Sequence, residues 1–415
     1  NAKVTTTINT FITPGSQINV AGDLIIRTNS RSIADAESRG SAYAIGPAVG
    51  VSLATATNAP VVNTYVGENS TIMVGGDFTL QTHHNIKESG EPNGGFTRAI
   101  AESSAGSLLG SGAGSNATAN ASPQITTYLD TGVVLNAAGN VTLEADTFNL
   151  LQAKSLGIAV GGLVGVGAAL TDAQVNSTTE VYSDGTITAG GDVHIKASGF
   201  EKATSETFAA AGGIGAGAGN STDITASPVV SAFLKPQRTI TAGGSVFIDA
   251  ESKTDFDATA NGISAGGLSI GASITDVNAT PSVSAYTDRN SQIIAANDIK
   301  LSARHNVDSN RSTISDTRST VRSDASAGGL IGGTGADADI ELSPNVSAYN
   351  ANNSSLVAGN TSDIHVEALS HAATSSTTKG ISGGALAVGA SLAEAVHNGT
   401  TLAYIGGTVS GGDLH

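Results

Sequence analysis

The chain has 415 residues, of which 13% are charged and 4% aromatic, and its formal net charge at pH 7 is −16. It contains no cysteine, which excludes a disulfide framework and a cysteine-based metal site. The acidic balance argues against nucleic-acid binding, which depends on basic patches, and no run of 18 apolar residues predicts a transmembrane helix.

A short segment that closes on an aromatic residue recurs along the whole chain. Its aromatic row is Phe11, Tyr65, Tyr128, Tyr182, Phe233, Tyr286, Tyr349 and Tyr404. Recurrence at intervals of 51 to 63 residues predicts a single array of stacked repeats over residues 1–415. The array divides into about seven and a half units, at approximately 1–60, 61–123, 124–177, 178–228, 229–281, 282–344, 345–400 and, partially, 401–415. An end inside the eighth unit predicts a piece of a longer array.

Each unit contains four pieces with strand character. In the fifth unit they are 229–233, 238–242, 245–252 and a long glycine block that runs to Pro281. The two longest units hold their extra residues at one corner, as polar insertions over 87–99 and 307–323. Stacked repeats tolerate such insertions because they project as loops from one side.

A turn motif, Ala/Gly-Gly-Asp, follows each aromatic residue. Its aspartates are Asp23, Asp77, Asp192, Asp298, Asp363 and Asp413, with Asn140 and Ser245 in the remaining units. We expect glycine to supply a positive φ and the aspartate to bond its own backbone. A Ca²⁺-binding ladder of these carboxylates is the alternative, which the Asn and Ser interruptions disfavour.

The glycine blocks alternate strictly between apolar and small residues, which is typical of a half-buried strand. In the third unit, Val164 and Val166 share one parity, whereas Gly165 and Gly167 occupy the other. We expect the bare face to allow unusually close packing by another sheet or another molecule; glycines that make tight bends are the alternative. The blocks also differ between odd and even units, so the array is predicted to alternate between two repeat types.

These patterns predict an all-β, solenoid-like rod, because glycine and β-branched residues dominate and no helical period appears. A unit of this length suits one large coil or two smaller ones. A row of separate β-sandwich modules is a further alternative, although each unit is short for one.

The columns "SP-x-VSAY", "ITAGGDV" and "G-x-G-x-x-VGAS" together resemble the repeats of giant bacterial surface adhesins, of the β-strand-repeat and filamentous-haemagglutinin-like kind. The resemblance covers the whole chain. It implies a right-handed β-solenoid or a related β-rod that is exported to the cell surface, where such proteins serve in adhesion, sheath or biofilm structure. It brings no catalytic residues with it.

Few residues suggest chemistry. The segment "GGTGAD" matches the start of a calcium-binding nonapeptide, which makes Asp337 and Asp339 weak Ca²⁺ candidates, but the apolar residue that the motif requires is missing. Adjacent His83 and His84 point to opposite faces of a strand and make a poor metal pair. We therefore predict no catalytic site, no cofactor-binding site and no metal site beyond those weak candidates.

Three functions remain open. The leading one is a non-enzymatic structural component of an extracellular bacterial fibre, sheath or adhesin stalk, whose partners are further copies or repeats of the same protein. The second is a carbohydrate-binding surface module of an adhesin, which would bind a surface polysaccharide through a local patch. The third is a polysaccharide-degrading β-helix enzyme, which needs one coil unlike the others.

Overall fold

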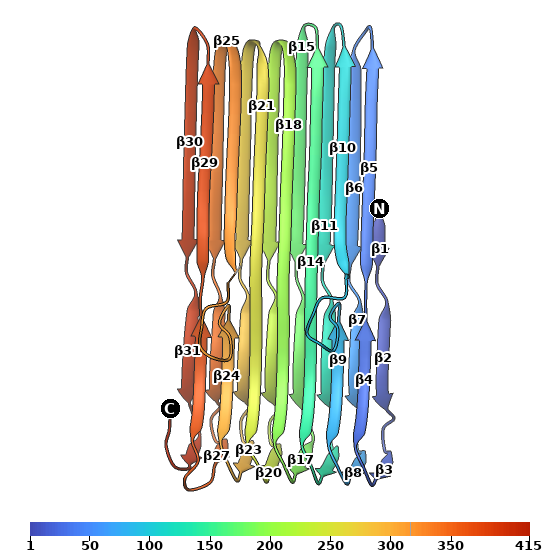
Figure 1. Cartoon of the computed structure of the whole chain (residues 1–415), viewed down its shortest axis with the longest axis vertical. Coiled ribbons are helices and arrows are strands. Elements are labelled where there is room, and N and C mark those ends of the chain that lie inside the picture. Colours follow the sequence, from blue (N-terminus) through green and yellow to red (C-terminus); the bar gives the residue numbers. More distant parts are fainter. Residues whose placement is uncertain (316) are drawn as a thin grey trace.

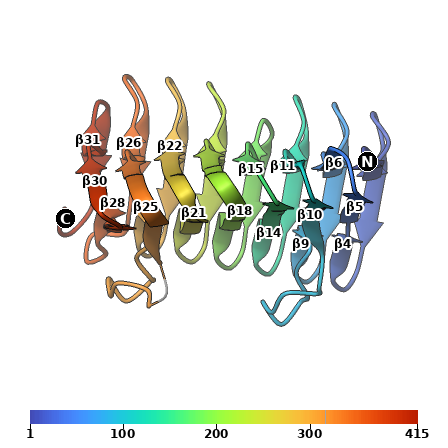
Figure 2. The ribbon, with the colours of Figure 1, turned by 90° about the horizontal axis from the view of Figure 1, so that it is seen from above.

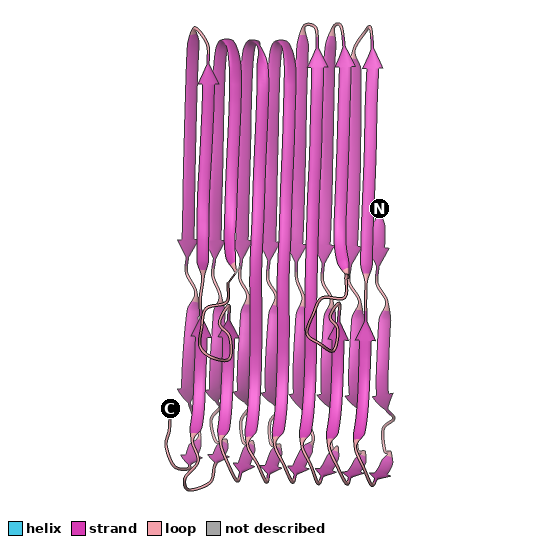
Figure 3. Cartoon of the chain, viewed as in Figure 1, coloured by secondary structure: helices cyan, strands magenta, loops and turns pink. Residues whose placement is uncertain are grey.

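The computed structural model describes residues 1–315 and 317–415. Position 316, in the second predicted insertion, lies outside the described residues. Strands make up 75% of the structure and the described residues contain no helix, which confirms the prediction of an all-β chain (Figure 3). In the described chain there is consequently no helix with the length and apolar character of a membrane span.

The chain winds as a flattened coil, and residues 61–121 illustrate one turn of it. β7 (Val61–Val66) leads into the short β8 (Thr71–Val74), and β9 (Phe78–His84) and β10 (Phe96–Ser107) form an upward run. The chain reverses at a tip, and β11 (Gly110–Ala121) forms a downward run beside the upward one (Figure 1). The next strand then starts the following coil.

Two of the three sheets contain one short strand from each coil. We call them sheet 2 and sheet 3. In order, sheet 2 comprises β2 (Thr7–Ile12), β7, β12 (Gln124–Leu129), β16 (Thr178–Ser183), β19 (Val229–Leu234), β22 (Ser282–Thr287), β26 (Asn345–Asn350) and β31 (Thr400–Ile405). Sheet 3 comprises β3 (Gln17–Val20), β8, β13 (Val134–Ala137), β17 (Thr186–Ala189), β20 (Thr239–Ala242), β23 (Gln292–Ala295), β27 (Ser355–Val357) and β32 (Thr408–Ser410).

The third sheet has 16 strands and folds over itself at the tip, so that it forms two layers. The upward layer contains β4 (Leu24–Ser30), β5 (Ile33–Ala44), β9, β10, β14 (Val141–Gly161), β24 (Ile299–His305), β28 (Ile364–Ser370) and β29 (Ala373–Gly383). The downward layer contains β1 (Ala2–Val4), β6 (Ala48–Asn58), β11, β15 (Val164–Val175) and β30 (Leu386–His397). Three strands pass through the tip and belong to both layers: β18 (Val193–Ala226), β21 (Val246–Ala279) and β25 (Arg318–Leu342).

Successive coils pair in parallel and in a single register. Tyr128 lies opposite Tyr65 on one side and Tyr182 on the other. The chain therefore makes one coil, not two, between neighbouring members of the aromatic row, and each coil advances the axis by the spacing of paired strands, ~4.8 Å. Parallel stacking of this kind is consistent with a β-solenoid-like fold.

The interior becomes thinner towards the tip. Between sheets 2 and 3 and the lower half of the upward layer, the core consists mainly of Val, Ile and Leu, with Phe78 among its largest buried side chains. Higher up, between the two layers, alanine dominates, with Phe256 as the largest exception beside a few Val, Ile and Leu side chains. Nearest the tip, the buried hydrophobic clusters consist of alanine alone.

The glycines that alternate with apolar residues near the tip point into this thin interior. A Cβ atom on Gly167 would lie 2.3 Å from the carbonyl oxygen of Ala210, and one on Gly165 would lie 2.3 Å from that of Gly212. The bare parity is therefore covered by the opposite layer of the same chain. The apolar parity points outward instead: Val164 and Val166 are about half exposed, the reverse of what alternation ordinarily implies.

The two polar insertions begin in the same way. Asn85 and Asn306 adopt positive φ angles of 58° and 56° directly after a strand of the upward layer. Their side-chain oxygens accept backbone N–H groups of the preceding coil, from Ser32 and Thr254, at 2.9 Å in both cases. Figure 2 shows both loops projecting from the side of the upward layer.

The close approach of the two layers predicts that the same substitution destabilises the fold at one glycine and changes little at a neighbouring one. We expect Gly167→Ala to destabilise the fold by about 1–3 kcal/mol, because the added methyl group meets a backbone carbonyl. The control is Gly217→Ala on the adjacent coil, where a Cβ would meet nothing within 4 Å. Thermal unfolding followed by circular dichroism measures both. Equal melting temperatures for the two variants would contradict the close packing.

Candidate functional site

The eight residues of the aromatic row form one continuous stack on the outer side of sheet 2. Neighbouring ring centroids lie 4.8–5.3 Å apart, and neighbouring ring planes differ by 3–22°. Lys235 adds a cation–π contact, with Nζ 4.8 Å from the centre of the Tyr182 ring. The rings therefore stabilise the contact between every pair of neighbouring coils.

This stack leaves little for a sugar to bind. A sugar packs on the face of an aromatic ring, but here the faces of the inner rings are covered by their neighbours. Burial is the main cause that raises the pKa of Tyr128 to about 12, and the neighbouring Tyr65 contributes to the same shift. Burial also raises the pKa of Tyr182. These phenols stay neutral at physiological pH and act as packing groups.

The turn aspartates form a second ladder along the axis. The side-chain oxygen of Asp23 accepts the backbone N–H of Asp77 in the next coil, at 2.8 Å. Equivalent bonds of 2.7–2.9 Å recur along the row, each from a backbone N–H to the side-chain oxygen of the preceding coil. The donor–acceptor pairs are Asn140–Asp77, Asp192–Asn140, Ser245–Asp192 and Asp363–Asp298. The aspartates therefore link one coil to the next, whereas we expected each to bond its own turn.

The glycine before each aspartate also has a different role from the expected one. Gly76 and Gly244 do not adopt positive φ. A Cβ atom on either would lie 2.1 Å from a carboxylate oxygen of the preceding coil, that of Asp23 or Asp192. Glycine is required because the aspartate of the neighbouring coil occupies the space that a side chain would fill.

The weak calcium candidates lie within a longer acidic row. Asp337 and Asp339 both point outward from β25, and Asp339 lies in register between Asp276 and Glu394. The complete row on the downward layer is Asp172, Asp223, Asp276, Asp339 and Glu394. The recurring "TD" in three of these strands is a sequence signal that we did not use. The Ca²⁺ assignment itself stays a prediction.

Mutual repulsion marks this row. Partial burial raises the pKa of Asp223, and the neighbouring Asp276 and Asp172 raise it further. Burial raises the pKa of Asp339 as well, together with Asp337, Glu394 and Asp276. Carboxylates stacked one strand spacing apart favour protonation because like charges at short distance disfavour the ionised form.

A compact cluster of titratable groups lies on the upward layer. His83 Nε2 is 3.5 Å from a carboxylate oxygen of Asp146 and 4.0 Å from one of Glu144, and Lys196 Nζ is 3.0 Å from Glu144. Burial opposes ionisation of Glu144, but His83 and Lys196 together lower its pKa to about 2, whereas burial and Glu144 raise the pKa of Asp146 to about 6. Three of these groups have metal-ligand geometry, but Lys196 already supplies the cation.

The neighbouring His84 points the other way, as the sequence predicted. Its Nδ1 lies 2.8 Å from the Ser30 hydroxyl, inside the coil, and burial lowers its pKa to about 4. A second group with metal-ligand spacing, Asp363, Asp413 and His415, lies between the last two coils, where two of its three residues are exposed. Sequence reasoning placed the aspartates in the turn row but missed His415 beside them.

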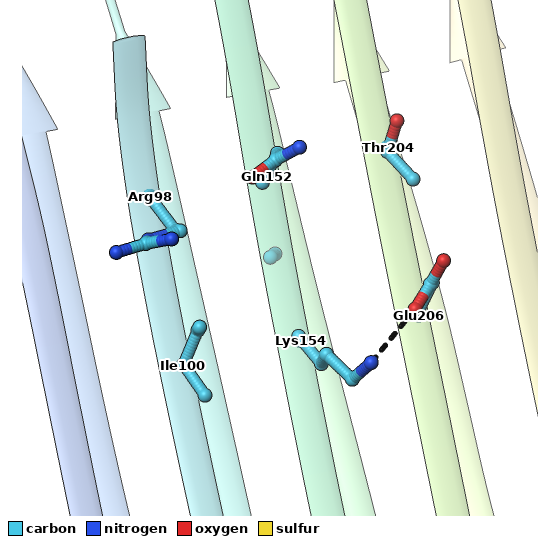
Figure 4. A pocket seen from close by; sticks show the side chains of 7 residues that line it. Arg98, Ile100, Gln152, Lys154, Thr204 and Glu206 are labelled. Atoms are coloured by element: carbon cyan, nitrogen blue, oxygen red, sulfur yellow. Dashed lines mark ion pairs between the residues drawn. The ribbon is translucent and has the colours of Figure 1, made fainter.

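A hollow of about 190 Å³ lies on the charged outer surface of the upward layer. Figure 4 shows its lining side chains projecting from three neighbouring strands, with Lys154 paired to Glu206 at 3.3 Å. Arg98 forms a two-pronged ion pair with Asp35 at 2.6 and 2.9 Å. The charged side chains that line the hollow already form ion pairs with residues of neighbouring coils. A ligand would therefore have to break these exposed ion pairs to bind in the hollow.

The outer surface of the downward layer is different, and we call it the ridged face. Ridge strands carry Val49, Val51 and Leu53 on β6; Val166, Ala168 and Leu170 on β15; Ile270, Ala272 and Ile274 on β21; and Val388, Ala390 and Leu392 on β30. Furrow strands between them carry Gly112, Gly114 and Asn116 on β11; Gly217, Gly219 and Ser221 on β18; and Gly333, Gly335 and Asp337 on β25. The Val, Leu and Ile side chains of the ridges are 48–70% exposed.

Comparison with known proteins gives no relative: no family model, curated protein or solved structure matches the chain.

The turn ladder predicts a specific pattern of stability. We expect Asp192→Ala to cost about 1 kcal/mol, because the N–H of Ser245 loses its acceptor. Asp192→Asn is the matched control, since Asn140 already makes the same bond with an amide oxygen. Chemical denaturation in the presence and absence of EDTA measures the loss. A large destabilisation by EDTA, or by the Asn variant, would favour cation binding over hydrogen bonding.

The acidic row predicts a pH-dependent gain from neutralisation. The pKa of Asp223 is raised in the folded state, so ionising this carboxyl removes stability as the pH rises through the folded-state pKa. We expect Asp223→Asn to increase the melting temperature at pH 7 and to make little difference below the unfolded-state pKa, ~3.9. Melting temperatures between pH 3 and 8 test this. A gain that is independent of pH would show that repulsion is not its source.

Proposed function

We propose that this chain is a non-enzymatic structural component of an extracellular bacterial fibre, sheath or adhesin stalk. In this proposal the chain is built from about seven and a half repeats of two alternating types, which are stacked along one axis. Its partners are further repeats or further copies of the same protein. The role needs no cofactor.

The continuous aromatic stack is the observation that carries this proposal. Eight rings from eight coils lie face to face along the axis, and the aspartate ladder and the backbone pairing run beside them. Each coil thus adds a ring and a set of backbone pairs to the one before it, as in quasi-one-dimensional repeat proteins. The turn-row hydrogen bond accompanies them at five of the seven steps. A rod held by contacts that recur along its axis suits a load-bearing or spacing role.

Two surface features support this role over the alternatives. A carbohydrate-binding module would need ring faces or a local polar cleft, but the inner ring faces are covered and the charged hollow at Lys154 is lined by paired groups. A polysaccharide-degrading enzyme would need a pair of free carboxyl groups at one distinct coil. Glu144 and Asp146 instead both lie beside Lys196, whose Nζ is 3.0 and 3.9 Å from their carboxylate oxygens.

Electron cryomicroscopy of the purified chain at neutral pH tests the proposal. We expect rods that elongate end to end, with an axial spacing of ~4.8 Å that continues across the junctions between chains. Unpaired strand edges on the first and last coils are templates for such growth. Separate short rods that bind or cleave a polysaccharide would contradict a purely structural role.

A further inference from the structure

We propose that the ridged face is a self-association surface, on which a second copy of this chain docks with its ridge side chains in the glycine furrows. The contact is lateral, between the sides of two rods. It deepens the proposed function and rests on it, because lateral contacts would convert single rods into a sheet or a bundle.

The furrow glycines are the first observation that points to an external partner. Glycine weakens a strand, so a fold retains it where a side chain does not fit. That reason applies to Gly167, which faces the opposite layer, but a Cβ atom on Gly217, Gly219 or Gly335 would meet nothing within 4 Å. The coil itself does not require glycine at these outward positions. A partner whose side chains fill the furrow would require glycine there.

The furrow on β25 is a depression in the surface. A hollow of about 350 Å³ lies over Gly335, between Ile274 on one ridge and Leu392 on the next. Its floor and walls are mostly apolar, and its size exceeds that of a single Val or Ile side chain. Asp337 is the one charged residue in the three rows that define the face. The surface is therefore suited to dry, apolar packing.

The spacing of the ridges identifies the occupant. Ridges recur on every second strand, so they lie ~9.6 Å apart, twice the distance between paired strands. A partner must present apolar side chains with this same period to fill several furrows at once. A second copy has that period by construction. When it is displaced by one coil, each of its ridges lies opposite a furrow.

The size of the face is close to the lower end of the range for specific interfaces. After a displacement by one coil, six strands of each copy face one another. Six strands at ~4.8 Å and about six residues at ~3.3 Å define roughly 570 Å² on each copy, and therefore roughly 1,140 Å² for the pair. Specific interfaces bury about 1,200–2,000 Å² in total, and those of transient complexes bury less. A continuous apolar patch of this extent on a free surface is itself typical of an interaction site.

Sedimentation velocity on the whole 415-residue chain tests the proposal, between about 1 and 100 μM protein, in ~150 mM salt to screen the net charge. We expect concentration-dependent dimers or larger species. The variant Gly219→Val with Gly335→Val fills two furrows and should weaken association at least tenfold, although it makes the face more apolar. Gly328→Val is the matched control: it adds the same side chain on the charged layer, where a Cβ also meets nothing within 4 Å.

The direction in which the furrow-filled variant changes the association distinguishes specific docking from nonspecific hydrophobic association. Association that is unchanged or stronger in the furrow-filled variant would overturn the proposal, as would a wild-type chain that stays monomeric over the whole range. Circular dichroism of each variant verifies that its fold is retained. Electron microscopy distinguishes the two levels: long rods of single width support the proposed function and refute lateral docking, whereas paired short rods do the opposite.

Discussion

The strict parallel register of successive coils is the constraint on which the rest of the structure depends. Because each residue lies beside its counterpart in the next coil, one strand spacing away, a residue type that recurs in every repeat interacts with copies of itself. Rings such as Tyr65 and Tyr128 gain from this arrangement. So does a turn aspartate, since its carboxylate accepts the N–H of its own counterpart. Carboxylates such as Asp223 and Asp276 lose: partial burial raises their pKa values, and neighbouring carboxylates raise them further.

The taper of the coil explains its unusual surface. Near the tip the two layers approach so closely that carbonyl oxygens occupy the space where a Cβ atom would lie, as at Gly167. Large side chains cannot fit between layers at that distance. Val, Leu and Ile at the opposite parity therefore point outward, and the fold gains stability from backbone pairing and alanine packing there rather than from a large apolar core.

The two outer surfaces of the coil then differ in character. The upward layer carries paired charges, such as Lys154 with Glu206, and both polar insertions project from its side. The downward layer carries apolar ridges and bare furrows. The acidic row from Asp172 to Glu394 borders these ridges on the same layer. The two outer surfaces therefore differ, and the ridged part of the downward layer presents an exposed apolar face.

The sequence by itself determined the all-β class, the period, the aromatic row, the turn row and the corner that bears the insertions, because these are repeated within one chain at readable spacing. It did not determine which parity faces inward, since apolar residues that alternate with small ones give the same pattern in either orientation. The distance between the layers decided that. The acidic row was partly readable from the recurring "TD", but the cluster of His83, Glu144 and Asp146 was hidden, because it joins unlike residues that do not recur from coil to coil. Only the register of the folded coil brings such residues into contact.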